Sequence, residues 1–199
     1  MVVTVLSVAL IAGCTGNDPD LPGLTATPST EPPATTTPTP TPTPAGARDL
    51  SDPELGIVFT DYPHDLDEQV VAAVEAYMLF ETEFWRALTT NVVPPGPWVI
   101  ASDDAIAWIQ AQVGPNAAAG WVLDGTLRTS VAVAARADSR LSLDVCRNWE
   151  QTHFVEPATG DTATNDELDL AATSRVTLDL VNVEGTGWQV TAHELTGEC

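Results

Sequence analysis

The chain has 199 residues and no Lys, and its 28 acidic against 7 basic side chains give a formal net charge of −21. Residues 51–199 alone hold 24 acidic and 6 basic side chains, a net charge of −18, and such a surface repels phosphate backbones, so we expect no nucleic-acid partner. The roughly 150 residues beyond the first fifty suffice for one domain and not for two.

An apolar run over residues 2–12 opens the chain. It is too short to cross a bilayer and has the length of a signal-peptide core. Residues 11–14 read Ile-Ala-Gly-Cys, which resembles the bacterial lipobox. This resemblance implies that residues 1–13 are a lipoprotein signal peptide, cleaved between Gly13 and Cys14. No Lys or Arg precedes the apolar run, so we expect the reading frame to begin further upstream.

The thiol of Cys14 is the predicted lipidation site, where a diacylglyceryl group and palmitate would be carried. Two acyl chains hold a protein firmly to a membrane. The lipid is therefore the expected contact with the membrane, and the predicted location is the outer face of the cytoplasmic membrane and the cell wall.

Residues 14–50 are rich in Thr, Pro, Ala and Gly, and over 37–44 Thr and Pro alternate. Proline fixes φ and lacks an N–H, so neither a helix nor a sheet ladder forms there. We predict a disordered, extended linker, on the order of 100 Å long. Whether its Thr hydroxyls carry sugars stays open.

A globular domain is predicted over residues 51–199, starting with helices. Asp65 or Asp67 can cap a helix whose apolar residues recur every three or four positions as far as Leu88. A shorter helix is predicted from Ser102 to a stop at residues 114–116, Gly-Pro-Asn.

Beyond Gly120 the apolar residues alternate with polar ones, which predicts strands around residues 127–133, 141–145, 176–180 and 188–192. Turns are expected near residue 138 and at 184–187. One apolar and one mixed face are typical of an antiparallel sheet covered by helices on one side. The predicted fold class is α+β, with N-terminal helices packed on an antiparallel sheet.

These features together resemble a set of actinobacterial surface lipoproteins, and the absence of Lys suits a high-GC genome. The resemblance rests on residues 77–85, 141–148, 187–190 and 197–199, and covers about residues 65–199. The domain is similar to the nuclear transport factor 2-like cone of ketosteroid isomerases and polyketide cyclases. That family implies a curved sheet wrapped around helices, with a pocket between them.

With Cys14 assigned to the lipid, Cys146 and Cys199 remain. A pair of cysteines in an exported protein most often forms a disulfide, and we predict one here. The chain has no Cys-x-x-Cys or His-x-x-x-His spacing, so we expect neither a metal nor a cofactor.

The three histidines are scattered, and we expect surface or pocket-rim positions for them rather than roles as bases. Tyr77, Trp98, Trp121 and Trp149 are the candidate pocket-lining residues. Isomerases of the cone fold use an Asp base with oxyanion donors. Asp144 and Asp179 alternate with apolar neighbours, so they are predicted to point away from the interior, and no catalytic residue is assigned.

We therefore expect a non-catalytic binding or interaction module of the cell envelope, whose partner is a small apolar ligand or an envelope protein. The alternative is an isomerase, dehydratase or cyclase acting on a small apolar substrate in the cone pocket. The oligomeric state stays open.

Overall fold

The structure is a computed structural model that describes residues 46–64, 66–93 and 99–199. The expected signal peptide, Gly13, Cys14 and most of the predicted linker lie outside the described residues. The last five residues assigned to the linker, 46–50, contact the domain: Ala47 is buried, and Arg48 donates two side-chain hydrogen bonds of 2.9 Å to Glu75. Folded contacts therefore begin a few residues earlier than predicted.

The first helix, α1, spans Glu68–Thr90 and carries the apolar periodicity that predicted it. Of the two residues expected to cap the helix, Asp67 is the N-cap. Its carboxylate accepts hydrogen bonds from the N–H groups of Gln69 and Val70. Asp65 lies outside the described residues. The helix ends at Asn91, which adopts the left-handed conformation.

The second helix, α2, spans Asp103–Ala119 and starts at Ser102, as predicted, but it does not stop at residues 114–116. It continues through Pro115 and ends at Gly120, where φ is 79°. Gly114 has no Cβ to clash with the following proline ring, so it tolerates the helical conformation. Three alanines after Asn116 favour a further turn.

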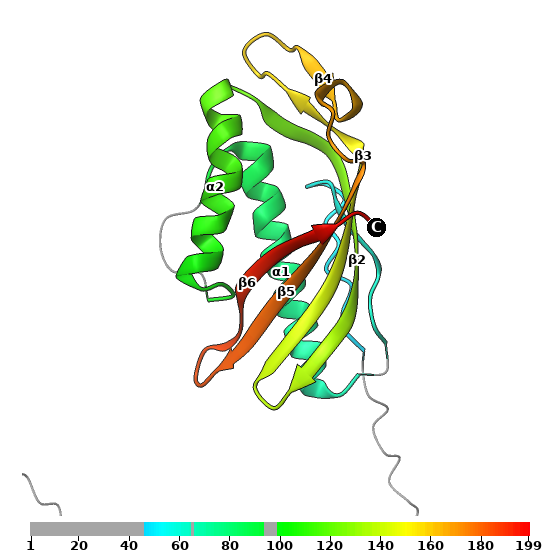
Figure 1. Cartoon of the computed structure of the whole chain (residues 1–199), viewed down its shortest axis with the longest axis vertical. Helices are drawn as coiled ribbons and strands as arrows, with labels where there is room; N and C mark the ends of the chain where they lie inside the picture. Colours follow the sequence, from blue (N-terminus) through cyan, green and yellow to red (C-terminus); the bar gives the residue numbers. More distant parts are fainter. Residues whose placement is uncertain (1–45, 65, 94–98) are drawn as a thin grey trace, which may run out of the picture. The chain divides into compact units, whose positions relative to one another are not determined.

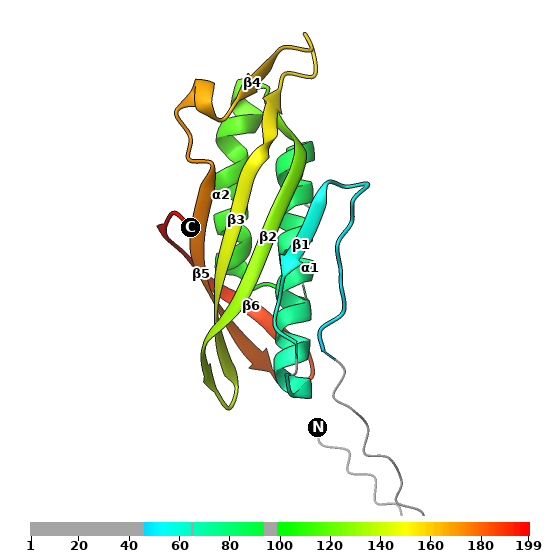
Figure 2. The ribbon, with the colours of Figure 1, turned by 90° about the vertical axis from the view of Figure 1, so that its right-hand side faces the viewer.

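Six strands form one mostly antiparallel sheet, in the order β1-β2-β3-β5-β6, with β4 paired to β3. Their bounds are β1 Ile57–Asp61, β2 Val122–Ala137, β3 Arg140–Val155, β4 Thr162–Thr164, β5 Thr173–Val183 and β6 Gly187–Gly197, with a short helix η1 at Asp166–Leu168. The α+β class and the four predicted strands are confirmed. Figures 1 and 2 show both helices on one face of the sheet.

The expected order of helices before the sheet does not hold, because β1 precedes α1 along the chain. This strand pairs in parallel with β2, so the sheet is not wholly antiparallel. The short β4 lies between β3 and β5 along the chain, where no strand was predicted, and pairs with β3. Both strands are short and lie at the sheet's periphery, so their pairing depends on partners distant in the sequence.

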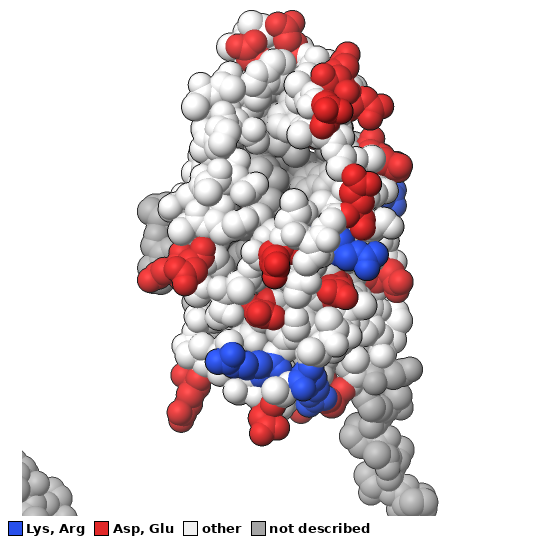
Figure 3. All heavy atoms as spheres, viewed as in Figure 1, with Lys and Arg blue, Asp and Glu red and all other residues white. Residues whose placement is uncertain are grey.

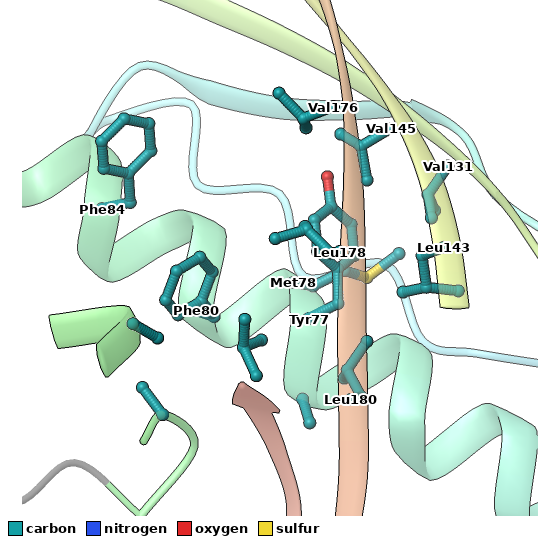
Figure 4. Packing of buried hydrophobic residues seen from close by; sticks show 14 of the residues in the cluster. Tyr77, Met78, Phe80, Phe84, Val131, Leu143, Val145, Val176, Leu178 and Leu180 are labelled. Carbon is teal, nitrogen blue, oxygen red and sulfur yellow. The ribbon is translucent and has the colours of Figure 1, made fainter. Parts of the chain in front are cut away.

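Helix α1 contacts β2 as well as β6, which are separated by two strands in the sheet order, so the sheet curves around this helix. The core fills the space between them. Its buried side chains from α1 face those from β2, β3 and β5, as Figure 4 shows. The labelled members are Tyr77, Met78, Phe80, Phe84, Val131, Leu143, Val145, Val176, Leu178 and Leu180. Asp144 and Asp179 point outward, as predicted.

The predicted cysteine pair lies at disulfide distance: the Sγ atoms of Cys146 and Cys199 are 2.15 Å apart. Because β5 lies between β3 and β6, the bridge connects β3 to the chain end across the intervening strand. Among the residues that the structure describes, no helix combines the length and hydropathy needed to span a membrane.

Candidate functional site

A cavity of about 540 Å³ lies between α2 and the sheet. Figure 3 shows this face of the molecule hollowed. Twelve apolar or aromatic side chains line the cavity: Phe84, Leu88, Trp108, Ala111, Pro115, Leu123, Trp149, Phe154, Leu170, Ala171, Val176 and Leu195. The polar lining consists of Gln112, Asn116, Arg147, Asn165, Thr173, Ser174 and His193.

Helix α2 contributes one wall of the cavity through Trp108, Gln112 and Asn116, which follow one another at four-residue spacing. Residues four apart lie on the same face of a helix, so these three side chains form a stripe. The core contacts of α2 lie on a neighbouring stripe that includes Ile109 and Val113. The helix therefore packs against the core along one stripe and presents indole and amide groups to the cavity along the next.

Arg147 of β3 lies at the inner side of the cavity and forms an ion pair with Glu81 of α1. The pair is buried: the Arg147 side chain is 3% exposed and that of Glu81 is 0%. Nε and Nη2 of Arg147 donate to Oε1 and Oε2 of Glu81 at 2.5 and 2.8 Å. Such two-point pairing is the strong geometry for guanidinium and carboxylate. It uses both oxygens of Glu81.

Two aromatic rings, which also contact each other, lie against the guanidinium of Arg147. Its Cζ lies 4.7 Å from the centre of the Phe84 ring and 5.8 Å from that of Trp108. A cation over a ring face is attracted by the ring's quadrupole. The ion pair with Glu81 and the aromatic rings of Phe84 and Trp108, one from each helix, therefore hold Arg147 in a fixed orientation at the cavity wall.

His193 of β6 stacks on Trp108, with ring centres 3.6 Å apart. Its Nε2 lies 2.9 Å from Nη1 of Arg147. Because an arginine can only donate, Nε2 accepts and the imidazole is neutral. Burial, and secondly the positive charge of Arg147, lower the pKa of His193 from 6.5 to about 3. The expected pocket-rim position fits this histidine, which lines the cavity and stays uncharged at neutral pH.

Trp149 of β3 forms the opposite wall and is held at both ends. Its Nε1 donates to Oγ of Ser174 at 2.9 Å, and its carbonyl oxygen accepts from Nδ2 of Asn165 at 2.8 Å. The ring centre lies 6.4 Å from that of Trp85 in the core. These contacts fix an indole at the cavity wall.

Of the four residues predicted to line a pocket, Trp149 lines this cavity. Tyr77 does not: it is fully buried in the core, and its hydroxyl lies 2.6 Å from Oγ1 of Thr129. Burial raises the pKa of Tyr77 well above its usual value. Trp121 is half-buried between α2 and β2 and lies outside the cavity lining. Trp98 lies outside the described residues.

Sequence reasoning missed the ion pair and Trp108 as parts of the site. A signal for the pair is present in both elements. Glu81 occupies the apolar phase of α1, between Tyr77 and Phe84, and Arg147 continues the inward-facing alternation of β3. A charged residue in an apolar phase is buried with a partner in most proteins. An acidic residue in the apolar phase of one element and a basic residue in that of another therefore predict a buried ion pair.

Comparisons with known proteins give no family. No protein-family model matches the chain, and no curated protein matches it. Among solved structures, the chain is similar to the crystal structure of the intermembrane space region of the chloroplast protein ARC6. The TM-score is 0.40 and the identity 14%, over 61% of this chain and 95% of that one. A likeness at this level supports no inference about function.

Proposed function

We propose that this protein is a lipid-anchored envelope protein whose domain binds a small, mainly apolar ligand in the cavity between α2 and the sheet, without transforming it. The observation that supports this proposal best is the lining of the cavity. Twelve of its side chains are apolar or aromatic, and the polar ones are amides, hydroxyls, one neutral imidazole and one paired arginine. Cavities of this size with few polar groups are typical of small-molecule sites.

Binding is favoured over the isomerase, dehydratase or cyclase alternative by the state of the buried acid and base. An isomerase of the cone type needs a carboxylate that can take a proton from its substrate. Glu81 uses both oxygens on Arg147. His193 accepts from Arg147 and has a pKa of about 3, so it is a poor base at neutral pH.

The anchoring part of the proposal rests on residues 11–14 and their likeness to a lipobox. We further propose that the domain belongs with the nuclear transport factor 2-like cones of actinobacterial surface lipoproteins. Two helices on one face of a curved, mostly antiparallel sheet support this assignment, as does the cavity between α2 and the sheet.

Ligand binding is tested with phenylnaphthylamine, an uncharged probe whose fluorescence rises in apolar surroundings. The full-length chain carrying Cys14→Ser avoids lipid and detergent. In this background, Ala111→Trp places an indole in the cavity from an exposed helix position, whereas Ala107→Trp alters an exposed position of the same helix outside the lining. We expect saturable binding, lost in Ala111→Trp and kept in Ala107→Trp. Equal binding by both variants would contradict the proposed site.

The anchor is tested separately by labelling with radioactive palmitate in a suitable bacterial host. We expect label on the wild-type chain and none on Cys14→Ala, which should leave the membrane fraction. An unlabelled wild-type chain, or a Cys14→Ala chain that remains at the membrane, would contradict lipidation at this residue.

A further inference from the structure

Within the part of the chain that the structure describes, the buried ion pair leaves two N–H donors of Arg147 without an acceptor. An arginine carries five N–H groups. Three of them donate within the described residues, two to Glu81 and one to His193. One N–H on Nη1 and one on Nη2 of Arg147 remain, on a side chain that is 3% exposed and lines the cavity.

A buried donor without an acceptor is costly, so a ligand oxygen placed against these N–H groups gains a strong hydrogen bond. The acceptors that Arg147 contacts among the described residues are both Glu81 oxygens and Nε2 of His193, and each already accepts a hydrogen bond from it. The cavity therefore offers a ligand two N–H donors of Arg147 within a mainly apolar lining.

The charge of the site decides which kind of oxygen fits. Glu81 neutralises Arg147, so a ligand carboxylate would bring an unpaired negative charge beside a buried glutamate. The chain segment that contributes Asn165 and Leu170 to the cavity also carries Asp166, Glu167 and Asp169. A ligand cation would instead approach the guanidinium of Arg147 directly. The site therefore disfavours charge of either sign.

Aromatic groups line the cavity on both helices and on β3. Phe84 and Trp108 lie against the guanidinium of Arg147, and Trp149 is fixed on the sheet side. Flat rings stack on such side chains with favourable geometry.

We propose that the ligand is an uncharged, flat aromatic or polycyclic molecule bearing one hydrogen-bond acceptor oxygen, which binds the free N–H groups of Arg147. This inference rests on the proposed function of the cavity. It adds the chemistry of the ligand and assigns Arg147 as the residue that selects a neutral oxygen, with Glu81 as the residue that sets the charge.

Three probes of similar shape separate the contribution of the hydrogen bond from that of the ligand's charge. Fluorene has no acceptor, fluorenone has one neutral carbonyl, and fluorene carboxylate is an anion. Binding to the full-length Cys14→Ser chain is measured by calorimetry at neutral pH. We expect fluorenone to bind roughly tenfold more tightly than fluorene, as for a hydrogen bond to a charged donor, and the carboxylate to bind most weakly.

Two variants complete the experiment. Glu81→Gln leaves the arginine uncompensated, and we expect the carboxylate to become the tightest of the three probes. Glu81→Met with Arg147→Met replaces the pair by apolar groups that can pack in its place, and should bind fluorene and fluorenone equally. Near-ultraviolet circular dichroism checks that both variants are folded.

Each outcome bears on a different claim. Equal affinity of the wild-type chain for fluorene and fluorenone would overturn the role of Arg147 and leave the cavity as a binding site. Tightest binding of the carboxylate by the wild-type chain would overturn the preference for a neutral oxygen. Failure of all three probes to bind would overturn the proposed function as well.

Discussion

Arg147 and Glu81 are single residues on which both the core and the cavity depend. We predict that Arg147→Met lowers the free energy of unfolding by about 3–5 kcal/mol, because it leaves the carboxylate of Glu81 buried without its partner. The double variant with Glu81→Met should regain most of this loss. Urea unfolding followed by circular dichroism measures both. Equal destabilisation in the single and double variants would show that the loss comes from altered packing and not from the unpaired carboxylate of Glu81.

His193 makes stability depend on pH in a defined direction. Its pKa is about 3 in the folded chain, against 6.5 as the ordinary value. Above pH 6.5 both states hold the neutral ring, so its contribution is fully present. As the pH falls from 6.5 towards 3, the unfolded chain takes up the proton and the folded chain does not, and the free energy of unfolding decreases.

The matching variant is His193→Gln, which keeps an acceptor for Arg147 and removes the titration. We expect the free energy of unfolding to fall less between pH 7 and pH 4.5 in His193→Gln than in the wild type, measured by urea titration at both pH values. Parallel decreases in the two proteins would mean that His193 is not the group responsible.

At the scale of elements, a close backbone approach joins the start of β1 to β2. Gly56 has φ +83°, and a Cβ added there would lie 2.2 Å from the carbonyl oxygen of Gly125. Gly185 has a similar φ of +78°, with open space around it. We predict that Gly56→Ala costs more than about 2 kcal/mol of stability and Gly185→Ala about 1 kcal/mol. Equal costs, measured by thermal unfolding, would mean that β1 shifts freely.

The elements that depend on local pattern were predictable, and those that depend on distant partners were not. Asp67 and the apolar spacing after it predict α1, and strict alternation predicts the strands from β2 to β6 except the short β4. The five residues of β1 have no comparable pattern, because their place is set by parallel pairing with β2. The extension of α2 through Pro115 required knowing that Gly114 relieves the clash.

In the site, too, residues set by local sequence pattern were easier to predict than those set by contacts between distant segments. Trp149 was predicted to line a pocket, and the structure places it within β3 at the cavity wall. Tyr77 was placed wrongly, since helical spacing could not tell which side of α1 faces the cavity and which faces Thr129. Arg147 and Glu81 meet across 66 residues of chain, so only the packing of α1 on β3 brings them together.

At the scale of the whole molecule, the bridge between Cys146 and Cys199 closes a loop with a sequence separation of 53 residues. The chain-entropy model gives about 4 kcal/mol for a loop of this length. We predict a loss of that order in the double variant Cys146→Ala with Cys199→Ala, measured by urea unfolding. Chemical reduction of the wild type should give the same loss. A loss below about 1 kcal/mol would mean that hydrogen bonding to β5, without the disulfide, suffices to hold β6 in the sheet.

The central claim is that a small ligand occupies the cavity between α2 and the sheet. Its most direct test is to follow the indole N–H signals of the tryptophans by nuclear magnetic resonance during titration with fluorenone, assigned through single Trp→Phe variants. We predict that the signals of Trp108 and Trp149 shift and saturate together, while that of Trp188, which is buried outside the cavity lining, stays in place. Saturating shifts at Trp188 with Trp108 and Trp149 unchanged would contradict the account.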